Sequence, residues 1–389
     1  MRACMVAYTF YEPDNRVRRY AETLVRRGDQ VDAIVLRQPG QQTRDVVSGV
    51  NVFKIQGRKV NEKIKIQYLF KLLLFLFKSA CKLTQLHWHK KYDVVHIHSV
   101  PDFEVFATLF AKLTGAKVIL DIHDIVPELF AGKFKAGKDS MFFKLLLWVE
   151  RISMAFADHV IVANHIWFKR LIERSVAPEK CSVVMNYPDP SIFTIRKKAG
   201  DSTDKFIMIY PGTLSIHQGL ETAIKAVDLI KNEIPDLEFH IYGKGTDEEY
   251  FIKLVHKLKL EKRVIFRSIV PIEMLPRLMA DADLGVEPKF KRSFGNEAFS
   301  TKILEFMTVG IPVIASDTMV HTHYFDETMV KFFRSEDEND LAHCITLLKK
   351  EEKLRRQLVK NAFKYIEKNS WNTKKNTYLN IVDSLRDCT

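Results

Sequence analysis

Apolar runs of strand length alternate with amphipathic stretches through the first half of the chain. Each short run is rich in β-branched residues, and most of the stretches between them repeat their apolar residues with helical spacing. Such alternation predicts a mostly parallel sheet with helices on both faces. The predicted strands are 3–8, 31–36, 50–55, 93–98, 116–121, 159–163 and 181–185, and the predicted helices are 15–27, 64–88, 102–114, 140–157 and 164–174.

The alternation stops at the segment Asn186–Pro190, where two prolines exclude regular structure. The polar stretch 196–204 follows and has the composition of a linker. A second alternating series then begins at Phe206. Its predicted strands are 206–210, 237–242, 263–266, 283–287 and 312–315, and its predicted helices are 219–232, 247–258, 273–280, 301–308, 337–350 and 352–368.

The two series predict an α/β protein with two doubly wound, Rossmann-like domains. We place a first domain at residues 1–190 and a second, ligand-binding domain at 205–370. A last helix, in the segment 371–389, is expected to cross back to the first domain. Ligands of such sheets bind outside the carboxyl ends of the strands, so we expect the site in a cleft where the two sheets face each other.

Composition agrees with a globular protein of two cores. The chain has 389 residues, of which 47% are hydrophobic and 28% are charged. Its five cysteines are scattered without a Cys-x-x-Cys pair, which argues against a zinc site or a disulfide framework and fits a reducing cytosol. The first eight residues have the pattern of a strand and not of a signal peptide.

The net charge of +12 is concentrated in one segment. Nine Lys or Arg residues and one Glu lie between Arg58 and Lys91. Within it, the apolar run Tyr68–Phe77 is too short and too interrupted to span a bilayer. Aromatic stacking motifs for nucleic acid are absent, so a nucleic-acid partner is not expected.

A helix over this basic segment would place Lys71, Lys78 and Lys82 on one stripe beside a broad apolar face. This arrangement predicts a helix in a membrane interface with its lysines near anionic lipid, and Phe142–Trp148 as a second contact. The alternative is a core helix whose basic edge is solvated.

Two glutamates, Glu297 and Glu305, stand eight positions apart around a predicted helix that begins near Ser300 and ends at Gly310. A helix N-terminus offers free N–H groups and a positive dipole, which suit phosphate. Carboxylates beside it accept hydrogen bonds from sugar hydroxyls. Phosphate next to hydroxyls describes a nucleotide sugar, although two solvated glutamates on a surface helix remain the alternative.

Histidines lie where predicted strands end in the first domain. His123 follows the strand that ends at Leu120, and its imidazole could donate to a sugar hydroxyl or stabilise developing charge. His96 and His98 end the preceding strand. Since side chains alternate along a strand, we expect at most one of these two at the site, with His98 as the candidate. A polar loop and core or capping histidines are the alternatives.

The loop after the first predicted strand holds Asp14, Asn15, Arg16 and Arg19. Asp14 or Asn15 could cap the following helix, and Arg16 or Arg19 could reach an anionic ligand. A solvated basic helix start explains the same residues equally well.

Several of these segments resemble the retaining GT-B glycosyltransferases of glycosyltransferase family 4. The stretch Glu297–Pro312 resembles the family's Glu-x7-Glu signature, whose first Glu approaches the donor sugar and whose second binds the donor ribose. Asp121–Glu128 resembles the His-Asp…Pro-Glu stretch, whose His lies beside the donor sugar. Asp14–Val17 resembles an Asp-x-Arg-Val subgroup and replaces the Gly-Gly loop of many members. Ile269–Pro271 resembles the loop whose backbone meets the nucleotide base.

The stretch Pro211–Leu220 resembles the family's Gly-Arg-Leu…Lys-Gly stretch but departs from it twice. Thr213 stands where the family usually has Arg, and Gln218 where it usually has Lys, and those two cations normally hold the diphosphate. Either another cation substitutes or donor binding is weak. We favour Lys302, in the first turn of the phosphate-facing helix. The other candidates are Lys289, Lys291 and Arg292.

No metal and no cofactor are expected. Asp281-Ala-Asp283 matches a metal-binding Asp-x-Asp in letters only, because it lies between a predicted helix and a predicted strand. The resemblance otherwise implies three groups of site residues. These are His123 and Glu297 in catalysis; Gly212, Thr213, Gln218, Gly243, Lys244, Val270, Phe299, Ser300, Thr301, Lys302 and Glu305 at the donor; and Asp14, Asn15, Arg16 and His98 on the acceptor side.

The sequence therefore predicts an enzyme that transfers a sugar from a nucleotide donor to a glycan or lipid-linked acceptor, with retention as implied by the resemblance. We expect it in the cytoplasm, at the inner face of the plasma membrane, in surface polysaccharide or glycolipid synthesis. The alternatives are a sugar-nucleotide epimerase of the same architecture and a weakly active scaffold that binds glycan or a partner protein. Thr213 and Gln218 motivate the scaffold.

Overall fold

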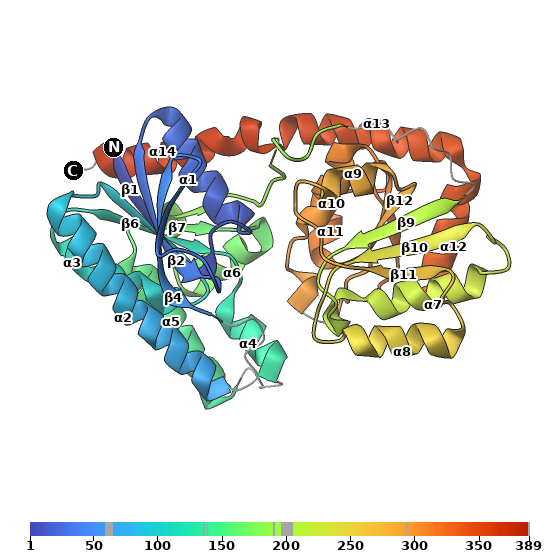
Figure 1. Ribbon diagram of the computed structural model, residues 1–389, viewed down its shortest axis with the longest axis horizontal. Coiled ribbons are helices and arrows are strands. Elements are labelled where there is room, and N and C mark those ends of the chain that lie inside the picture. The colour runs from blue at the N-terminus through green and yellow to red at the C-terminus, as the bar shows by residue number, and fades with distance from the viewer. Residues whose placement is uncertain are drawn as a thin grey trace. The chain divides into compact units, whose positions relative to one another are not determined.

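The computed structural model describes residues 1–58, 65–134, 137, 139–189, 191–195, 205–292 and 294–387. The chain forms two compact units (Figure 1). The first unit comprises the described residues from Met1 to Asn186 and from Lys374 onward, and the second comprises those of Tyr187–Thr373. The predicted linker 196–204 lies outside the described residues.

The first unit is built on an eight-stranded sheet of order β3-β4-β2-β1-β5-β6-β7-β8. All neighbouring strands pair in parallel except β3 and β4. The strands are β1 (Arg2–Phe10), β2 (Gln30–Arg37), β3 (Arg44–Val47), β4 (Val50–Gly57), β5 (Val94–His98), β6 (Lys117–Ile122), β7 (His159–Val162) and β8 (Cys181–Val183).

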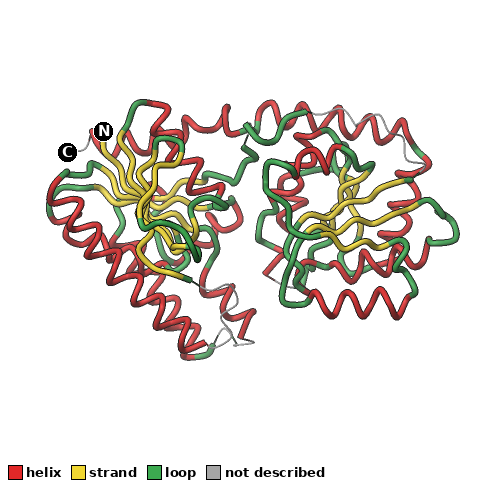
Figure 2. Tube along the Cα trace, viewed as in Figure 1, coloured by secondary structure: helices red, strands yellow, loops and turns green. Residues whose placement is uncertain are grey.

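Helices lie on both faces of this sheet, as the alternation predicted (Figures 1 and 2). The predicted helix 102–114 is a 3₁₀ helix followed by a short α-helix. The helical elements are α1 (Asn15–Arg27), α2 (Lys65–His89), η1 (Asp102–Thr108), α3 (Leu109–Leu113), α4 (Val126–Phe134), α5 (Met141–Phe156), α6 (His165–Arg174), η2 (Pro178–Lys180) and α14 (Trp371–Asp387).

The second unit has a six-stranded, all-parallel sheet of order β11-β10-β9-β12-β13-β14. Its elements are β9 (Phe206–Pro211), η3 (Ile216–Gln218), α7 (Leu220–Ile230), β10 (Leu237–Tyr242), α8 (Glu248–Leu258), β11 (Val264–Arg267), α9 (Leu275–Ala280), β12 (Leu284–Glu287), η4 (Phe294–Asn296), α10 (Thr301–Val309), β13 (Val313–Ser316), α11 (Met319–Tyr324), β14 (Lys331–Phe333), α12 (Glu338–Lys350) and α13 (Glu352–Lys368). The predicted fold of two Rossmann-like α/β domains is confirmed.

The C-terminal helix α14 packs in the first unit from Lys374 onward. Arg27 of α1 donates to the carboxylate of Asp383 at 2.8 Å. Tyr378 is completely buried, and its ring centroid lies 4.3 Å from that of Tyr20. Residues from the two ends of the chain therefore share one core. Across the part of the chain that the structure describes, none of the helices has the length and apolar character that crossing a membrane requires.

Candidate functional site

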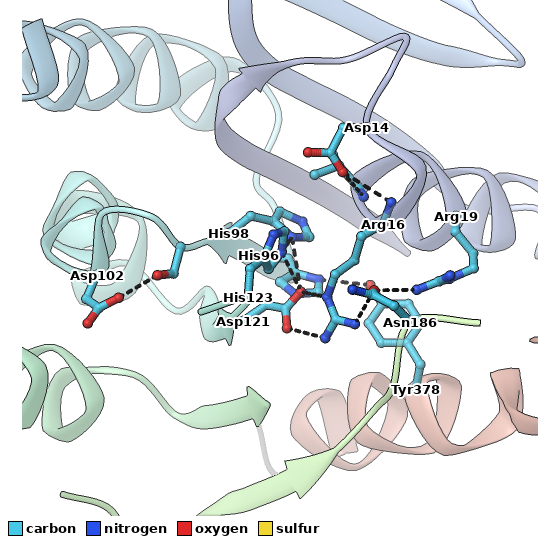
Figure 3. A network of polar contacts seen from close by, with 12 residues as sticks. Asp14, Arg16, Arg19, His96, His98, Asp102, Asp121, His123, Asn186 and Tyr378 are labelled. Carbon is cyan, nitrogen blue, oxygen red and sulfur yellow. Dashed lines mark hydrogen bonds and ion pairs between the residues drawn. The ribbon is translucent and has the colours of Figure 1, made fainter. Parts of the chain in front are cut away.

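A buried polar network lies at the carboxyl edge of the first unit's sheet, centred on Asp121 (Figure 3). Parallel pairing of β5 with β6 sets His98 beside Asp121. The loop after β1 ends at Asp14, whose carboxylate caps α1 by accepting from the backbone N–H groups of Arg16 and Val17. Helix α1 therefore begins at the carboxyl edge of the sheet, directly after the loop that follows β1.

Arg16 and Asp121 form a bidentate ion pair. The Arg16 Nε donates to Asp121 Oδ2 at 2.7 Å, and its Nη2 donates to Oδ1 at 2.6 Å. Both side chains are buried. Burial alone would raise the pKa of the Asp121 carboxyl, but Arg16 and His123 outweigh it and hold that pKa well below its usual range. Asp121 is therefore a permanent acceptor at neutral pH.

Three histidines surround this carboxylate. His123 Nε2 lies 3.0 Å from Asp121 Oδ2, and His98 Nδ1 lies 3.2 Å from the same oxygen. The two imidazole nitrogens are 3.1 Å apart. Burial lowers the pKa of His98 and, more strongly, that of His96, so both are neutral. Because an ionised carboxylate only accepts, the nitrogens that face Asp121 carry the protons.

The expectation that His96 and His98 point to opposite sides of β5 is wrong. Their rings stack with centroids 4.2 Å apart. Side chains alternate along a strand with a period of two residues, so neighbours two apart share a face. His96 and His98 therefore both belong to the Asp121 network, and both are buried.

His123 is the most accessible histidine of this network, with 21% of its side chain exposed. Its Nε2 faces Asp121, which leaves its Nδ1 for a ligand. The arrangement can present a neutral acceptor at Nδ1, or a donor once the ring is protonated, beside a fixed negative charge. The structure thus places His123 directly after the end of β6, as the sequence predicted, and adds the charged neighbours Asp121 and Arg16, which the sequence did not indicate.

The side chains of Arg16 and Arg19 both reach Asn186, the last residue before the first unit is interrupted. Arg16 Nη1 donates to Asn186 Oδ1 at 2.7 Å, and Arg19 Nη2 donates to the same oxygen at 3.1 Å. The Arg16 guanidinium thus has protein partners on three of its nitrogens. Asn15 is the first residue of α1. Nothing local in the sequence signals Asn186 or Tyr378 as members of this network, since both reach it through the fold.

Within the described residues, His96, His98 and Asp121 come close enough to share a metal ion. The chemistry of this set fits a metal poorly. Both oxygens of Asp121 already accept from Arg16, and that buried cation would repel a second positive charge. The same residues suit an oriented imidazole better.

In the second unit, a buried ion pair joins β12 to α10. Lys302 Nζ lies 2.8 Å from Glu287 Oε2 and 4.3 Å from the centroid of the Tyr210 ring on β9. Glu287 is completely buried. Burial acts to lower the pKa of Lys302, but the charge of Glu287 outweighs it and raises that pKa above its usual range. Lys302 is therefore charged, although Glu287 offsets much of that charge.

Glu305 lies on α10, one turn beyond Lys302. It is only 8% exposed, and burial raises the pKa of its carboxyl to about 7 against a hydrogen bond from Thr301 and the charge of Lys302. Ser300 occupies the N-cap of α10 but accepts no capping hydrogen bond through its side chain. Glu297 is half-buried just before this helix. The Phe299 ring packs edge-on against Tyr324 at 5.0 Å.

Two loops meet backbone to backbone at the carboxyl edge of the second sheet. Gly212 N–H donates to Tyr242 O at 2.8 Å, and Leu214 N–H donates to Lys244 O at 3.1 Å. A Cβ on Gly243 would lie 1.8 Å from Gly212 O, so only glycine allows this approach. Thr213 and Lys244 are exposed beside this contact, and Gln218 and Val270 are half-buried in the adjoining loops.

The three other candidate cations have carbonyl or carboxylate partners. Lys289 donates to Ala298 O at 3.0 Å, Lys291 lies 3.0 Å from Asp317, and Arg292 lies 3.1 Å from Glu336.

Sequence reasoning missed Glu287, which ends a strand of otherwise apolar residues, and His321, which is buried. Burial lowers the pKa of His321 to about 4 although Glu287 opposes that shift.

Asp281 and Asp283 serve the fold of the second unit. Asp281 is the C-cap of α9, and the Asp283 carboxylate accepts from the backbone N–H of Ile207 at 2.9 Å. The two residues therefore lie between a helix and a strand, as the sequence indicated, and the Asp283 hydrogen bond also joins the start of β12 to β9.

Helix α2 has two apolar faces. Leu72 and Phe75 are buried, and the Phe75 ring packs on Tyr8 of β1, whereas Phe70 and Phe77 are exposed, Phe77 at 68%. The alternative of a core helix with a solvated basic edge accounts for the buried apolar face but not for the exposed one. The predicted lysines are half-buried along this helix. Lys59, Glu62 and Lys63 of the basic segment lie outside the described residues. The exposed apolar side chains recur at helical spacing, as Leu69, Phe70, Leu73 and Phe77 on α2 and Met141, Phe142, Leu145 and Trp148 on α5.

Two family descriptions match the chain, one for each unit. Residues 13–187 match the glycosyl transferase 4-like domain, and residues 191–365 match the glycosyl transferases group 1. Together the two matches span most of the chain.

Curated relatives carry similar descriptions. An uncharacterized glycosyltransferase, MJ1607 of Methanocaldococcus jannaschii, is 26% identical over 307 residues, which cover 76% of this chain and 74% of the relative. The putative colanic acid biosynthesis glycosyl transferase WcaI of Escherichia coli is 28% identical over 218 residues. That match covers 52% of this chain and spans about half of the relative, 51% of its length.

Solved structures share the fold. The sucrose-phosphate synthase of Thermosynechococcus elongatus superposes with a TM-score of 0.81 at 18% identity, covering 100% of both chains. Anabaena Alr3699/HepE, solved in complex with UDP-glucose, superposes with a TM-score of 0.72 at 17% identity, covering 98% of this chain and 99% of its own.

Proposed function

The chain is a GT-B glycosyltransferase composed of a 4-like domain and a group 1 domain, and we propose that it moves a sugar from a nucleotide diphosphate to a membrane-linked glycan acceptor with retention of configuration. The oxygen of the acceptor hydroxyl bonds to the anomeric carbon of the sugar, and the hydroxyl proton passes to the departing diphosphate. The bond from that carbon to the diphosphate oxygen breaks, and the nucleoside diphosphate leaves. The family matches do not favour an epimerase or an inactive scaffold.

The observation that carries this proposal is the start of α10. The Ser300 side chain at its N-cap makes no capping hydrogen bond, Glu297 precedes the helix, and Glu305 is the fifth residue of it. Free N–H groups at a helix start favour phosphate, and the carboxylates favour hydroxyls. HepE, which shares the fold, is solved with UDP-glucose. We assign the donor to this edge and the acceptor to the edge around His123.

The leaving diphosphate needs positive charge as well as N–H groups. Lys302 and Lys289 approach the same Glu287, Lys302 at 2.8 Å and Lys289 at 3.9 Å, so two cations share one carboxylate. We propose that this excess charge replaces the cations that Thr213 and Gln218 lack. No divalent metal is then required for transfer.

The proposal is tested by nucleotide binding followed by transfer. We expect UDP or GDP to raise the Tm, since a ligand at a hundred times its Kd adds about 2.7 kcal/mol of stability. Transfer from the matching nucleotide sugar to lipid-extracted acceptor should proceed with excess EDTA. NMR of the product should show the donor's anomeric configuration. Inversion would refute retention, and loss of turnover in EDTA with recovery in Mn²⁺ would refute metal independence.

Donor affinity is expected to rise with pH through Glu305. In the folded protein without donor, the pKa of the Glu305 carboxyl is about 7, above the usual Glu value. The carboxyl is therefore mostly protonated below pH 7 and becomes ionised as the pH rises through 7. If ribose hydroxyls bind the ionised carboxylate, UDP-glucose should bind about tenfold more tightly at pH 8 than at pH 6. Isothermal titration across this range measures the effect. Glu305→Gln should bind more weakly with no such slope, and an equal slope in that variant would remove Glu305 from the donor site.

The exposed apolar stripes on α2 and α5 support a membrane-linked acceptor. They include the exposed side chains of Phe77 and Trp148. Lys71, Lys78 and Lys82 lie along α2. Aromatic side chains enter the bilayer interface while lysines pair with anionic lipid. We propose that the first unit binds the inner face of the plasma membrane through these helices, from the cytoplasmic side.

Charge reversal on α2 is expected to release the protein from anionic vesicles. Lys71, Lys78 and Lys82 should each contribute about 1 kcal/mol near an anionic surface. Changing all three to Glu should abolish co-sedimentation with phosphatidylglycerol vesicles. The same change at Lys253, Lys257 and Lys262, exposed on or after α8, keeps the total charge equal and should leave binding intact. Equal binding by both triple variants would contradict a membrane contact at α2.

A further inference from the structure

Tyr378 joins the C-terminal helix to the Asp121 network. Its hydroxyl lies 3.2 Å from His96 Nδ1, and its ring lies 4.3 Å from Tyr20 (Figure 3). The side chain is completely buried, and α14 is anchored nearby by the pair of Arg27 and Asp383. A buried hydroxyl on an anchored helix holds its partner in one orientation.

The His96 ring, which Tyr378 contacts, stacks on the ring of His98. The two rings lie 4.2 Å apart and are inclined by 22°. Tyr20 stacks on His98 from a centroid distance of 5.9 Å, and it also contacts His96 at 5.1 Å. The His98 ring is therefore confined by His96 and Tyr20, and Tyr378 contacts both of these residues.

His98 and His123 share one oxygen. Both face Asp121 Oδ2, at 3.2 Å and 3.0 Å, and the Nε of Arg16 donates to the same atom at 2.7 Å. Three N–H groups around one oxygen leave little room, since the two histidine nitrogens are only 3.1 Å apart. The position of His98 thus limits where His123 can lie and which of its nitrogens keeps the proton.

We propose that Tyr378 is a positioning residue for His123: by holding His96 it fixes the stacked His98 ring, which shares Asp121 Oδ2 with His123. The inference rests on the proposed function only in giving His123 a part in transfer. Tyr378 itself does not touch the substrate. Its effect reaches the reaction through the orientation and tautomer of His123.

Tyr378→Phe removes the hydroxyl and keeps the ring. We expect kcat to fall about 2- to 10-fold, as for loss of one hydrogen bond, while the donor KM stays unchanged. In a His123→Ala background the same substitution should change kcat less than twofold, because residues that act through one another are not additive. Equal losses in both backgrounds would show a merely structural role and overturn the proposal.

NMR of the histidine side chains tests the same proposal without substrate. Its result therefore decides the proposal even if no transfer activity is found. In ¹⁵N-histidine protein, the His123 signals are identified by their loss in His123→Ala. Tyr378→Phe should shift them toward a mixture of tautomers, and unchanged His123 signals would overturn the proposal. Tyr92→Phe is the matched control: Tyr92 is buried in the same unit and donates to Asp32 at 2.6 Å, so its loss should leave His123 and kcat unaffected.

Discussion

Lys302→Ala is expected to lower the free energy of unfolding of the second unit by about 3–5 kcal/mol. The substitution leaves the completely buried Glu287 without the ammonium that lies 2.8 Å from its carboxylate. The Lys289 ammonium, 3.9 Å from Glu287, then compensates that buried charge only in part. A poorly compensated buried charge is costly, whereas an exposed pair contributes little. Urea unfolding followed by fluorescence and circular dichroism measures the loss, with each unit's transition analysed by itself.

Rescue separates stability from donor binding. Adding Glu287→Gln to Lys302→Met removes both charges, and we expect most of the lost stability to return. The donor KM of this folded double variant then reports what Lys302 contributes to the diphosphate. Lys331→Ala, which breaks a solvent-exposed pair with Glu327, should cost only about 0–1 kcal/mol. If Lys302→Ala were as stable as this control, the buried pair would not hold α10 to β12.

His123→Ala should lower kcat by roughly 10²- to 10³-fold with a much smaller change in donor KM. The Nε2 of this residue is bound to Asp121, which leaves Nδ1 as the nitrogen for the reacting groups. An interaction made mainly in the transition state affects kcat more than binding. Turnover at saturating donor and acceptor is the measurement.

The matched control is His240→Ala in the second unit. His240 Nε2 lies 3.0 Å from the Glu238 carboxylate, so this variant also breaks a histidine–carboxylate pair. It should leave kcat within about twofold of wild type, because His240 is not among the residues assigned to the donor or the acceptor. Turnover of His123→Ala near that of His240→Ala would exclude His123 from the reaction.

Regular elements were predictable where periodicity and capping agree. Asp14 caps α1 as its side chain suggested, and Gly28 ends that helix in a left-handed conformation at φ 98°. Strand β3 was missed because Arg44–Val47 is mostly exposed and lacks apolar alternation. It forms a hairpin with β4 through Ser48 and Gly49, which both have positive φ. Helix α4 was missed since the Pro127–Glu128 segment was interpreted as a motif and not as a helix start.

The candidate sites were predictable only as far as their local segments. His123 and Glu305 stand in recognisable stretches, and the structure surrounds both with charged groups. The partners of His123 come from distant parts of the chain, and Glu287 has no signal of its own. A buried partner is chosen by the fold, so its sequence distance from the motif carries no information.

The return of α14 makes the second unit an insertion in the first. The first unit is interrupted at Asn186 and resumes at Lys374. During synthesis, domains generally fold in order from the N-terminus. Here the first unit must wait, because Tyr378, which packs on Tyr20 and contacts His96, emerges from the ribosome after the whole second unit. The unit that begins first is therefore completed after the second one, and its histidine network gains Tyr378 only once the whole second unit has been synthesised.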